Sequence, residues 1–475
     1  MMRNRINNYG KYLCFSLVWL VFASCNDWLD VEPKSQVKDK DLFSSESGFK
    51  EALAGVYSIM TQECLYGKEL TFGMLGVLAQ EWDYQPTDYN DDKDYKYENT
   101  RPEVRIDSIW NGLYNAIANA NKLLEEIDGK KSMFTGVNYD VIKGEALAAR
   151  AFLHFDLLRL FAPYDFSSEA KPAIPYVKEA RPAIAPQLTP AKFVEYALED
   201  VNAAIALLKE DPILTGKDIT GMDNGYLANR NFHLNYYAAV GLKARICLYA
   251  GNTKDAYDAA NEVILAQQNS DLFPWVKTED ITTTTIELRD RTFSTEHLFA
   301  FNTNKLGEYI KGYFRETSTP LISRILPAEL YEPDDYRNAL YEIYSGSANV
   351  LTKFWQLESV YVSGQGLVRP KRDRMPGIRI AEMYYIATEA LKDSNIGEAI
   401  TTLNMLRAYR GLPGLSNLSK EELQKELEME YYRELIGEGQ VFFYHKRINT
   451  KMIATANAAY VLPMPDDEID LGQRQ

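Results

Sequence analysis

Two stretches of the chain, 233–267 and 378–409, share one form: a helix, a short polar turn and a second helix. Within each helix the apolar residues recur three and four positions apart, which is typical of one buried helix face. Small residues occupy matching positions in the two stretches, namely Ala244, Ala256, Ala387 and Ala399. Because small side chains let two helix backbones approach, the pattern restricts the chain to closely packed pairs of helices.

The same apolar periodicity recurs earlier in the chain and predicts further helices over 46–62, 107–127, 138–161 and 190–208. The two stretches described above resemble the tetratricopeptide helix–turn–helix, in which helix pairs stack side by side. With the looser pairs over 46–127 and 138–208, we expect a mostly α fold of four such units. The alternative is a set of generic helical hairpins.

About a third of the chain shows no helical periodicity. Residues 63–106 and 270–376 are rich in Tyr, Asp, Gly and Thr, with only short strand-like runs such as 298–301. Long irregular segments in a compact protein are usually functional or disordered, and the aromatic content here argues against disorder. We therefore predict that these two regions form the ligand side of the molecule.

The N-terminus has the three parts of a signal peptide. Arg3, Arg5 and Lys11 precede an apolar run over 13–23, which is too short to span a bilayer and ends in small residues. The run leads into Cys25, as in a bacterial lipobox, so we expect cleavage of residues 1–24 and lipidation of Cys25. An ordinary secretory signal with a chance cysteine remains the alternative.

Charge and cysteine content narrow the class of protein. The formal net charge of −15 becomes −18 once the three basic residues of the signal are removed, which makes nucleic acid an unfavourable partner. No linker divides residues 25–475, which are predicted to form one domain. Cys64 and Cys247 lie in helical apolar patterns and are predicted to be buried thiols rather than a disulfide.

Several segments form an ordered set of motifs along the chain, from the expected mature N-terminus through two repeat helices to a C-terminal signature within 421–469. They are 25–33, Phe43, 52–57, 144–152, 379–385, 388–390, Glu430, 433–435, 437–440, 462–465 and 468–469. In this order they resemble the SusD-like (RagB/SusD) family of outer-membrane lipoproteins. The resemblance covers the chain from Cys25 to about Ile469.

The C-terminal signature departs from the family at one pair of positions. After Gly439-Gln440 the family usually has an Arg and, three residues later, an Asp, whereas this chain has Val441 and Tyr444. Both ionic partners are replaced by residues able to pack at the same spacing. We therefore interpret the signature as structural, with the role of docking a C-terminal helix.

The resemblance implies a surface lipoprotein of the bacterial outer membrane that closes over a partner, a SusC-like TonB-dependent transporter. It further implies binding of starch or another oligosaccharide or polysaccharide and its delivery to that transporter. One alternative is a peptide-binding, RagB-like protein of the same transporter type. A second alternative is a repeat scaffold that grips a partner protein without binding a small ligand.

The sequence offers no recognisable catalytic arrangement. The chain has four histidines, and it lacks the zinc-protease, serine-hydrolase and Cys-x-x-Cys motifs. The acidic loop 88–94 alternates carboxylates but lacks the turn glycine and closing glutamate of an EF-hand, so calcium there is only a weak alternative to no cofactor. Paired carboxylates for glycoside hydrolysis are always available in a chain this acidic. We expect a binding protein and not an enzyme.

Binding of sugars requires flat aromatic rings together with planar amides, carboxylates or guanidinium groups. The loop 82–97 and a later cluster around 309–315, followed by Trp355, combine these residue types. The candidate ligand-binding residues are Trp82, Tyr84, Asp88, Tyr89, Asn90, Tyr95, Tyr309, Tyr313 and Trp355. This choice rests on side-chain chemistry and loop placement.

Overall fold

The computed structural model describes residues 41–83, 86–181, 183–215, 225–314, 320–325, 327–344, 348–451, 458–472 and 474. The chain divides into two compact units, Met1–Gly48 and Phe49–Gln475. The predicted signal peptide, Cys25 and Tyr84 lie outside the described residues, so the start of the mature domain at residue 25 stays a prediction. The elements discussed below belong to the second unit, apart from the first residues of α3.

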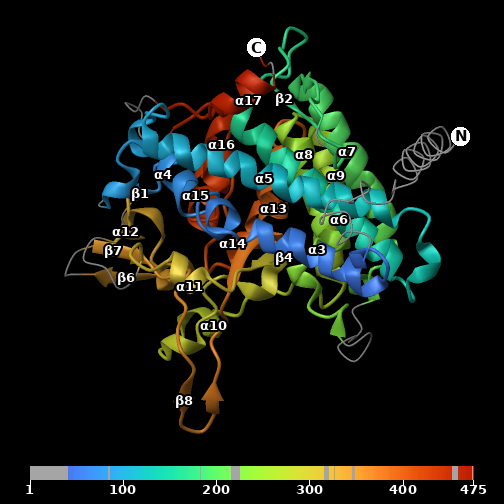
Figure 1. Ribbon diagram of the computed structural model, residues 1–475. Coiled ribbons are helices and arrows are strands. Elements are labelled where there is room, and N and C mark those ends of the chain that lie inside the picture. The colour runs from blue at the N-terminus through green and yellow to red at the C-terminus, as the bar shows by residue number, and fades with distance from the viewer. Residues whose placement is uncertain are drawn as a thin grey trace, which may run out of the picture. The chain divides into compact units, whose positions relative to one another are not determined.

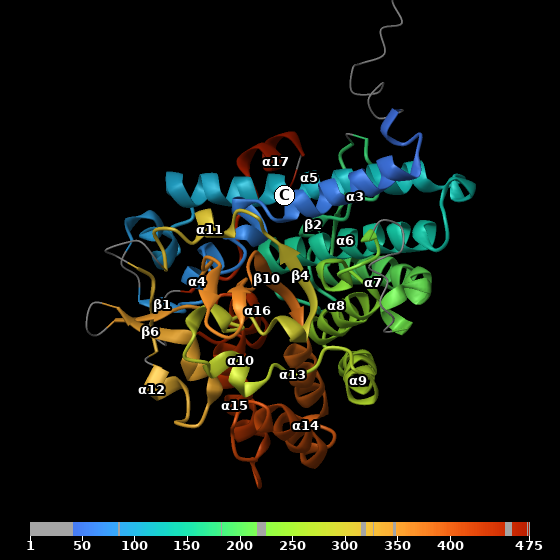
Figure 2. The same cartoon turned by 90° about the horizontal axis from the view of Figure 1, so that it is seen from below.

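The predicted repeat helices are present, and successive helices lie side by side (Figures 1 and 2). They are α3 (Glu46–Met60), α5 (Thr100–Ile127), α6 (Asn138–Phe161), α7 (Pro190–Leu207), α8 (Tyr236–Tyr249), α9 (Thr253–Asn269), α13 (Ile380–Leu391) and α14 (Ile396–Ala408). Helix α5 packs on α6, α6 on α7, α8 on α9, α9 on α13 and α13 on α14. Within the described residues, no helix has the length and apolar character needed to cross a membrane.

The two matching stretches fold in the same way, as their sequences predict. Ala244, Ala256 and Ala399 are fully buried and Ala387 is nearly so, which confirms them as positions of close packing. The second helix of each pair begins at an asparagine N-cap. The Asn252 side chain accepts a hydrogen bond from the Asp255 amide, and Asn395 does the same for Glu398, both at 3.3 Å.

The first loop-rich region is shorter and more helical than predicted. Helix α5 begins at Thr100, seven positions before the predicted start, after an extended residue at Asn99. Pro102 lies in the first turn, where its missing N–H costs no helical hydrogen bond. The same region contains the π-helical turn η1 (Glu63–Gly67) and the buried helix α4 (Met74–Leu78). The predicted boundary at residue 106 was therefore wrong.

Short antiparallel strand pairs organise the irregular regions. The strand-like run at 298–301 lies in β4 (His297–Asn302), which pairs with β10 (Arg374–Arg379). Strand β1 (Trp82–Asp83) pairs with β5 (Ile322–Ser323), which joins the first loop-rich region to the second. The remaining pairs are β2 (Ile174–Pro175) with β3 (Gln187–Leu188), β6 (Tyr341–Tyr344) with β7 (Ala348–Leu351), and β8 (Val360–Val362) with β9 (Gly366–Val368). The β8–β9 hairpin extends away from the helices (Figure 1).

The C-terminal signature forms α15 (Lys420–Leu435), α16 (Gln440–Ile448) and α17 (Asp466–Leu471). Val441 and Tyr444 of α16 are both buried. The Tyr444 ring stacks on Tyr431 of α15 with ring centroids 4.4 Å apart, and its hydroxyl accepts a hydrogen bond from Gln424 at 2.6 Å. Both side chains lie in the core, and Tyr444 packs α16 against α15, in keeping with the interpretation of these positions as structural.

Candidate functional site

The two aromatic clusters singled out in the sequence meet in space. Asp88 lies in the short 3-10 turn η2 (Thr87–Tyr89), and Tyr313 follows helix α11 (Leu306–Tyr309). The Tyr313 hydroxyl donates to the Asp88 carboxylate at 3.4 Å, and the rings of Tyr89 and Tyr313 are 6.0 Å apart. Residues more than 200 positions apart in the chain therefore share one surface.

Beside this contact, an open groove of about 710 Å³ runs between the first turns of α5, the turn η1 and α11. We call it the aromatic groove. It is lined by Gln62, Glu63, Cys64, Glu69, Thr100, Arg101, Val104, Arg105, Ser108, Lys305 and Tyr309. A more polar hollow of about 610 Å³ contains the exposed Asn90 and shares Thr100 and Arg101 with the groove. The volume, the polar tips and the aromatic side chain suit a ligand of several hydroxyl-bearing rings.

The base of the groove is a network of charged and hydroxyl groups that satisfy one another. Tyr89 donates its hydroxyl to Glu69 at 2.9 Å, and Arg105 donates to Asp92 at 2.7 Å. The Arg105 guanidinium lies 4.3 Å from the centre of the Tyr89 ring. Burial and the charge of Glu69 raise the pKa of Tyr89 well above its usual value, so the hydroxyl stays protonated and remains a donor. The network fixes the surface above it.

The Lys68 ammonium packs against the face of the Tyr313 ring. It lies 5.2 Å from the ring centre and 3.1 Å from Glu69. Burial by itself would lower the pKa of Lys68, but Glu69 and Glu63 outweigh burial and raise it, so the ammonium keeps its charge. A charged ammonium against an aromatic face stabilises the orientation of the ring.

Two of the predicted ligand-binding residues are core residues. Trp82 is only 1% exposed, and its indole N–H donates to the Phe72 carbonyl at 2.9 Å. Its ring packs edge-on against Phe314. Tyr89 is fully buried beneath the groove. Neither ring is open to a ligand, so the prediction of direct contact was wrong for both residues, because composition alone does not separate a supporting aromatic from an exposed one.

Tyr95 and Trp355 are half-buried and lie outside the residues that line the groove. The Tyr95 hydroxyl donates to the Leu78 carbonyl at 2.7 Å, and its ring packs against Tyr460. The Trp355 indole donates to the Phe314 carbonyl at 3.3 Å. Their predicted roles, like that of Tyr84, stay predictions.

Sequence analysis missed several residues that line the groove, among them Arg101 and Val104. Both lie on the part of α5 that was predicted as loop. The spacing of Arg101, Val104, Arg105 and Ser108 at three and four positions places them on one helix face, a pattern that was visible in the sequence. Cys64 was predicted to be a buried thiol but is half-exposed and lines the groove, whereas Cys247 is buried as expected.

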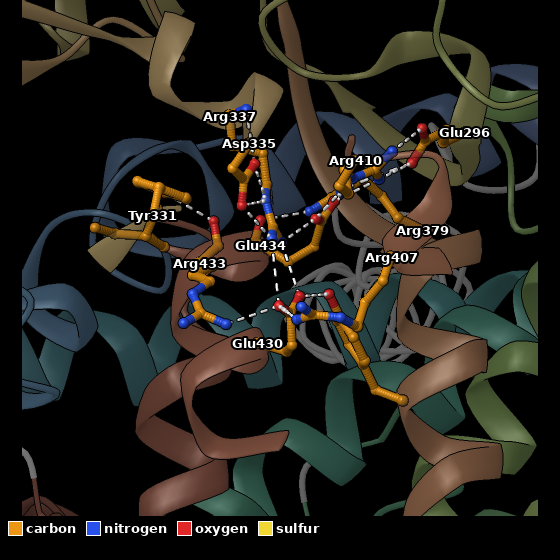
Figure 3. Close-up of polar contacts among 12 residues, drawn as sticks. Glu296, Tyr331, Asp335, Arg337, Arg379, Arg407, Arg410, Glu430, Arg433 and Glu434 are labelled. Atoms are coloured by element: carbon orange, nitrogen blue, oxygen red, sulfur yellow. Dashed lines mark hydrogen bonds and ion pairs between the residues drawn. The ribbon is translucent and has the colours of Figure 1, made fainter. Parts of the chain in front are cut away.

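Buried charges outside the lining of the groove form a second polar region, which we call the Glu434 cluster (Figure 3). It comprises Glu296, Asp335, Arg337, Arg379, Arg407, Arg410, Glu430 and Glu434. Glu434 accepts hydrogen bonds from three guanidinium groups, those of Arg337, Arg379 and Arg410, at 2.5 to 3.0 Å. Burial alone would raise the pKa of Glu434, but the three cations outweigh burial and hold it well below its usual value.

The Glu434 cluster joins elements from different parts of the chain. Glu430 and Glu434 lie on α15, Arg379 ends β10, and Arg337 belongs to the 3-10 turn η11 (Tyr336–Leu340). Its charges are paired with one another inside the protein, so the cluster fastens the second loop-rich region to the helices. Arg433 of the C-terminal signature donates to Glu430 at 2.9 Å, so Glu430, Arg433 and Glu434 of the signature are structural residues.

The histidines and carboxylates offer no assembled metal site in the part of the chain that the structure describes. His154 is fully buried, accepts a hydrogen bond from the Val177 amide through Nε2 at 2.9 Å, and is a core residue. In the acidic loop, Asp92 is paired with Arg105 and Asp94 with Lys96. These carboxylates serve ion pairs within the protein.

Comparison with known proteins gives two family matches that together span most of the chain. Residues 27–216 match the family described as "Starch-binding associating with outer membrane", and residues 230–460 match the SusD family. The SusD-like protein P2 of Formosa agariphila is 21% identical over 97% of this chain and 97% of its own length. The SusD-like protein P25 of the same organism is 24% identical over 32% of this chain, which spans 30% of that relative.

Solved structures show the same fold. A SusD-like carbohydrate binding protein from Bacteroides vulgatus superposes with a TM-score of 0.69 at 17% identity, over 90% of this chain and 97% of its own. A laminarin binding SusD-like protein superposes with a TM-score of 0.66 at 18% identity, over the same shares of the two chains. At these identities the likeness shows the stacked-helix fold with its irregular loops.

Proposed function

Because the protein belongs to the SusD family, we propose that it binds oligosaccharides or polysaccharides in the aromatic groove. The observation that carries the proposal is the meeting of the two loop-rich regions at Asp88 and Tyr313, beside a groove lined by Tyr309. Carbohydrate binding by two proteins of the same fold supports this choice of ligand.

The side chains around the groove suit the two faces of a sugar. The C–H face of a pyranose packs against an aromatic ring, which Tyr309 and Tyr313 offer because both are half-exposed. Sugar hydroxyls need donors and acceptors at the edge of the rings. Arg101 and Asn90 supply donors there, and Asp88 supplies an acceptor. Rings for stacking and polar groups for hydrogen bonding, placed side by side, favour a glycan as the ligand.

The groove binds without chemical turnover in this proposal. Hydrolysis of a glycosidic bond requires two carboxyl groups placed on either side of the bond, one of them as an acid. Glu69 and Asp92 at the base of the groove are both held by Arg105, at 3.4 and 2.7 Å. Both carboxylates are therefore ion-paired within the protein, in the network that supports the groove.

The proposed place of the protein in the cell rests on the N-terminal sequence. We propose that Cys25 is lipidated after removal of residues 1–24 and that the lipid holds the protein on the surface of the outer membrane. The family description of association with the outer membrane supports this location. There the protein would pass its glycan to a SusC-like TonB-dependent transporter, the partner that the family resemblance implies.

Calorimetric titration of the mature protein with a panel of polysaccharides, including starch and laminarin, and with peptides tests the proposal. We expect at least one polysaccharide to bind and Tyr309→Ala to weaken that binding by about tenfold, the effect of one lost stacking contact. Tyr361→Ala is the matched control, because Tyr361 is 77% exposed on β8, away from the groove.

Three results would contradict the proposal. Binding of peptides without any polysaccharide would favour the RagB-like alternative. A pull-down from outer membranes without a co-purifying barrel, combined with no response to any ligand, would favour the scaffold. Release of shorter sugars from a polysaccharide by the purified protein would identify an enzyme.

A further inference from the structure

A second hollow of about 340 Å³ lies beside α3, next to the aromatic groove but with a different lining. Its size falls in the range of small-molecule sites, roughly 300–1,000 Å³. It is bordered by the middle of α3, the end of β4 and the 3-10 turn η8 (Arg230–Phe232). The lining side chains that matter here are Tyr57, Ser58, Tyr226, Phe232, His233 and Asn304.

Aromatic rings form one side of this hollow. Tyr57 and His233 meet edge to face with ring centroids 5.6 Å apart, and Tyr226 lies 6.3 Å from His233 in a similar arrangement. Phe232 has the Arg374 guanidinium over its ring at 4.8 Å. All four rings are half-exposed, so the hollow presents aromatic surface to solvent.

A buried carboxylate fixes the position of these rings. Glu145 of α6 is fully buried, accepts the Tyr57 hydroxyl at 2.7 Å and contacts His233 Nδ1 at 2.9 Å. Burial alone would raise the pKa of Glu145, but Arg230 and His233 outweigh it and bring it to about 2. The contact with Glu145 fixes the Nδ1 edge of the His233 ring, which is half-exposed and lines the hollow.

Polar groups form the other side. Asn302 and Asn304 are exposed at the end of β4, and Ser58 is exposed on α3. Amides and hydroxyls opposite aromatic rings match the chemistry of a sugar, as in the aromatic groove.

The hollow and the groove are neighbours along two segments of the chain. Thr61 lines the hollow and Gln62 the groove, while Asn304 lines the hollow and Lys305 the groove. The two spaces therefore share two stretches of bordering chain, 61–62 and 304–305, in which consecutive Cα atoms are only about 3.8 Å apart. A ligand that occupies both spaces has to consist of several linked rings.

We propose that the second hollow is a further subsite for the same glycan and binds additional sugar units of a chain held in the aromatic groove. This inference rests on the proposed function. A ligand that spans both subsites makes the second binding event intramolecular, so the contacts in the hollow add to the overall affinity. The protein would then select for longer oligosaccharides.

Titration with a size series of two to eight sugar units tests the subsite. The series is prepared from the polysaccharide that binds in the panel above, with laminarin oligosaccharides tried first. We expect affinity to rise by about tenfold from the short to the long members, the effect of one added stacking contact. Ser58→Trp fills the hollow from α3 and should remove this gain while leaving short members bound. Gly55→Trp, the matched control, places the same ring at an exposed position of α3 that does not line the hollow, and it should keep the gain.

Asn304→Trp fills the hollow from its other side and is expected to act as Ser58→Trp does, so the test does not depend on one variant. Far-ultraviolet circular dichroism checks that each variant is folded. Retention of the length-dependent gain in both Ser58→Trp and Asn304→Trp would overturn the subsite. In that case, loss of binding in Tyr309→Ala would still support the groove. Absence of binding by every polysaccharide would overturn both proposals.

Discussion

The aromatic groove and the Glu434 cluster are both rich in polar side chains from distant parts of the chain, yet they serve opposite purposes. In the cluster, Glu434 and Arg337 are fully or almost fully buried and bound to one another. In the groove, Tyr309 and Arg101 meet solvent above a buried base. Side chains that satisfy one another hold a fold together, whereas side chains left open above a rigid support can bind a ligand.

The buried base of the groove resembles the Glu434 cluster in its pairing. Glu69, Tyr89 and Arg105 are bonded to one another as the residues of the cluster are. The groove therefore combines a small structural network with an exposed layer, and only the exposed layer is expected to determine ligand affinity.

The largest effect is expected from Glu434→Ala. The substitution leaves three buried guanidinium groups without their shared carboxylate, which should lower the free energy of unfolding by about 3–5 kcal/mol. Urea denaturation measures the change. Glu421→Ala, on an exposed position of the same helix α15, is the control and should change stability by less than about 0.5 kcal/mol. Equal effects of the two variants would refute the structural role of the cluster.

Trp82→Phe tests the reassignment of this residue to the core. The smaller ring leaves a cavity and removes the hydrogen bond to the Phe72 carbonyl, so we expect a loss of about 1–3 kcal/mol in unfolding free energy. Glycan affinity of the folded variant should be unchanged in a titration at 25 °C. A loss of glycan affinity with unchanged stability would contradict the core assignment and indicate that Trp82 contacts the ligand.

The buried Glu81 should make stability depend on pH. Burial raises its pKa to about 8 in the folded protein, well above that of an exposed carboxyl group in the unfolded chain. The folded state thus holds the proton more tightly, so the stabilisation is complete in acid and is lost as pH rises through 8. Glu81→Gln cannot ionise. Its stability relative to the original protein should rise between pH 5 and 8, by roughly 1–3 kcal/mol, in thermal unfolding experiments. A constant difference across this range would contradict the shift.

The smallest effect is expected from Tyr313→Phe, which keeps the ring and removes only the hydroxyl. The hydrogen bond to Asp88 is long and exposed, so its loss should change stability by less than about 0.5 kcal/mol. Binding should persist in this variant, while Tyr313→Ala should weaken it by about tenfold. If phenylalanine lowered affinity as much as alanine, hydrogen bonding and not stacking would govern the groove.

Local pattern in the sequence determined the helical part of the fold. The spacing of apolar residues and the paired alanines, such as Ala244 and Ala256, predicted the repeat helices, because helix periodicity is set by each segment's own neighbours. The replacement of an ionic pair by Val441 and Tyr444 also indicated a structural role for these positions, and both side chains are buried. The start of α5 was missed. Residues 100–106, which include Pro102, were predicted as loop, although the first turn of a helix accepts a proline.

Only the tertiary structure decided which aromatic residues face a ligand. Trp82 and Tyr309 both lie in tyrosine-rich loops, yet pairing of β1 with β5 and the close approach of Gly76 place the Trp82 ring inside. Tyr309 instead borders a groove made with α5, a helix about 200 positions away. Exposure depends on which distant segments cover a side chain, and that is set by the packing of the whole chain and not by the residues on either side.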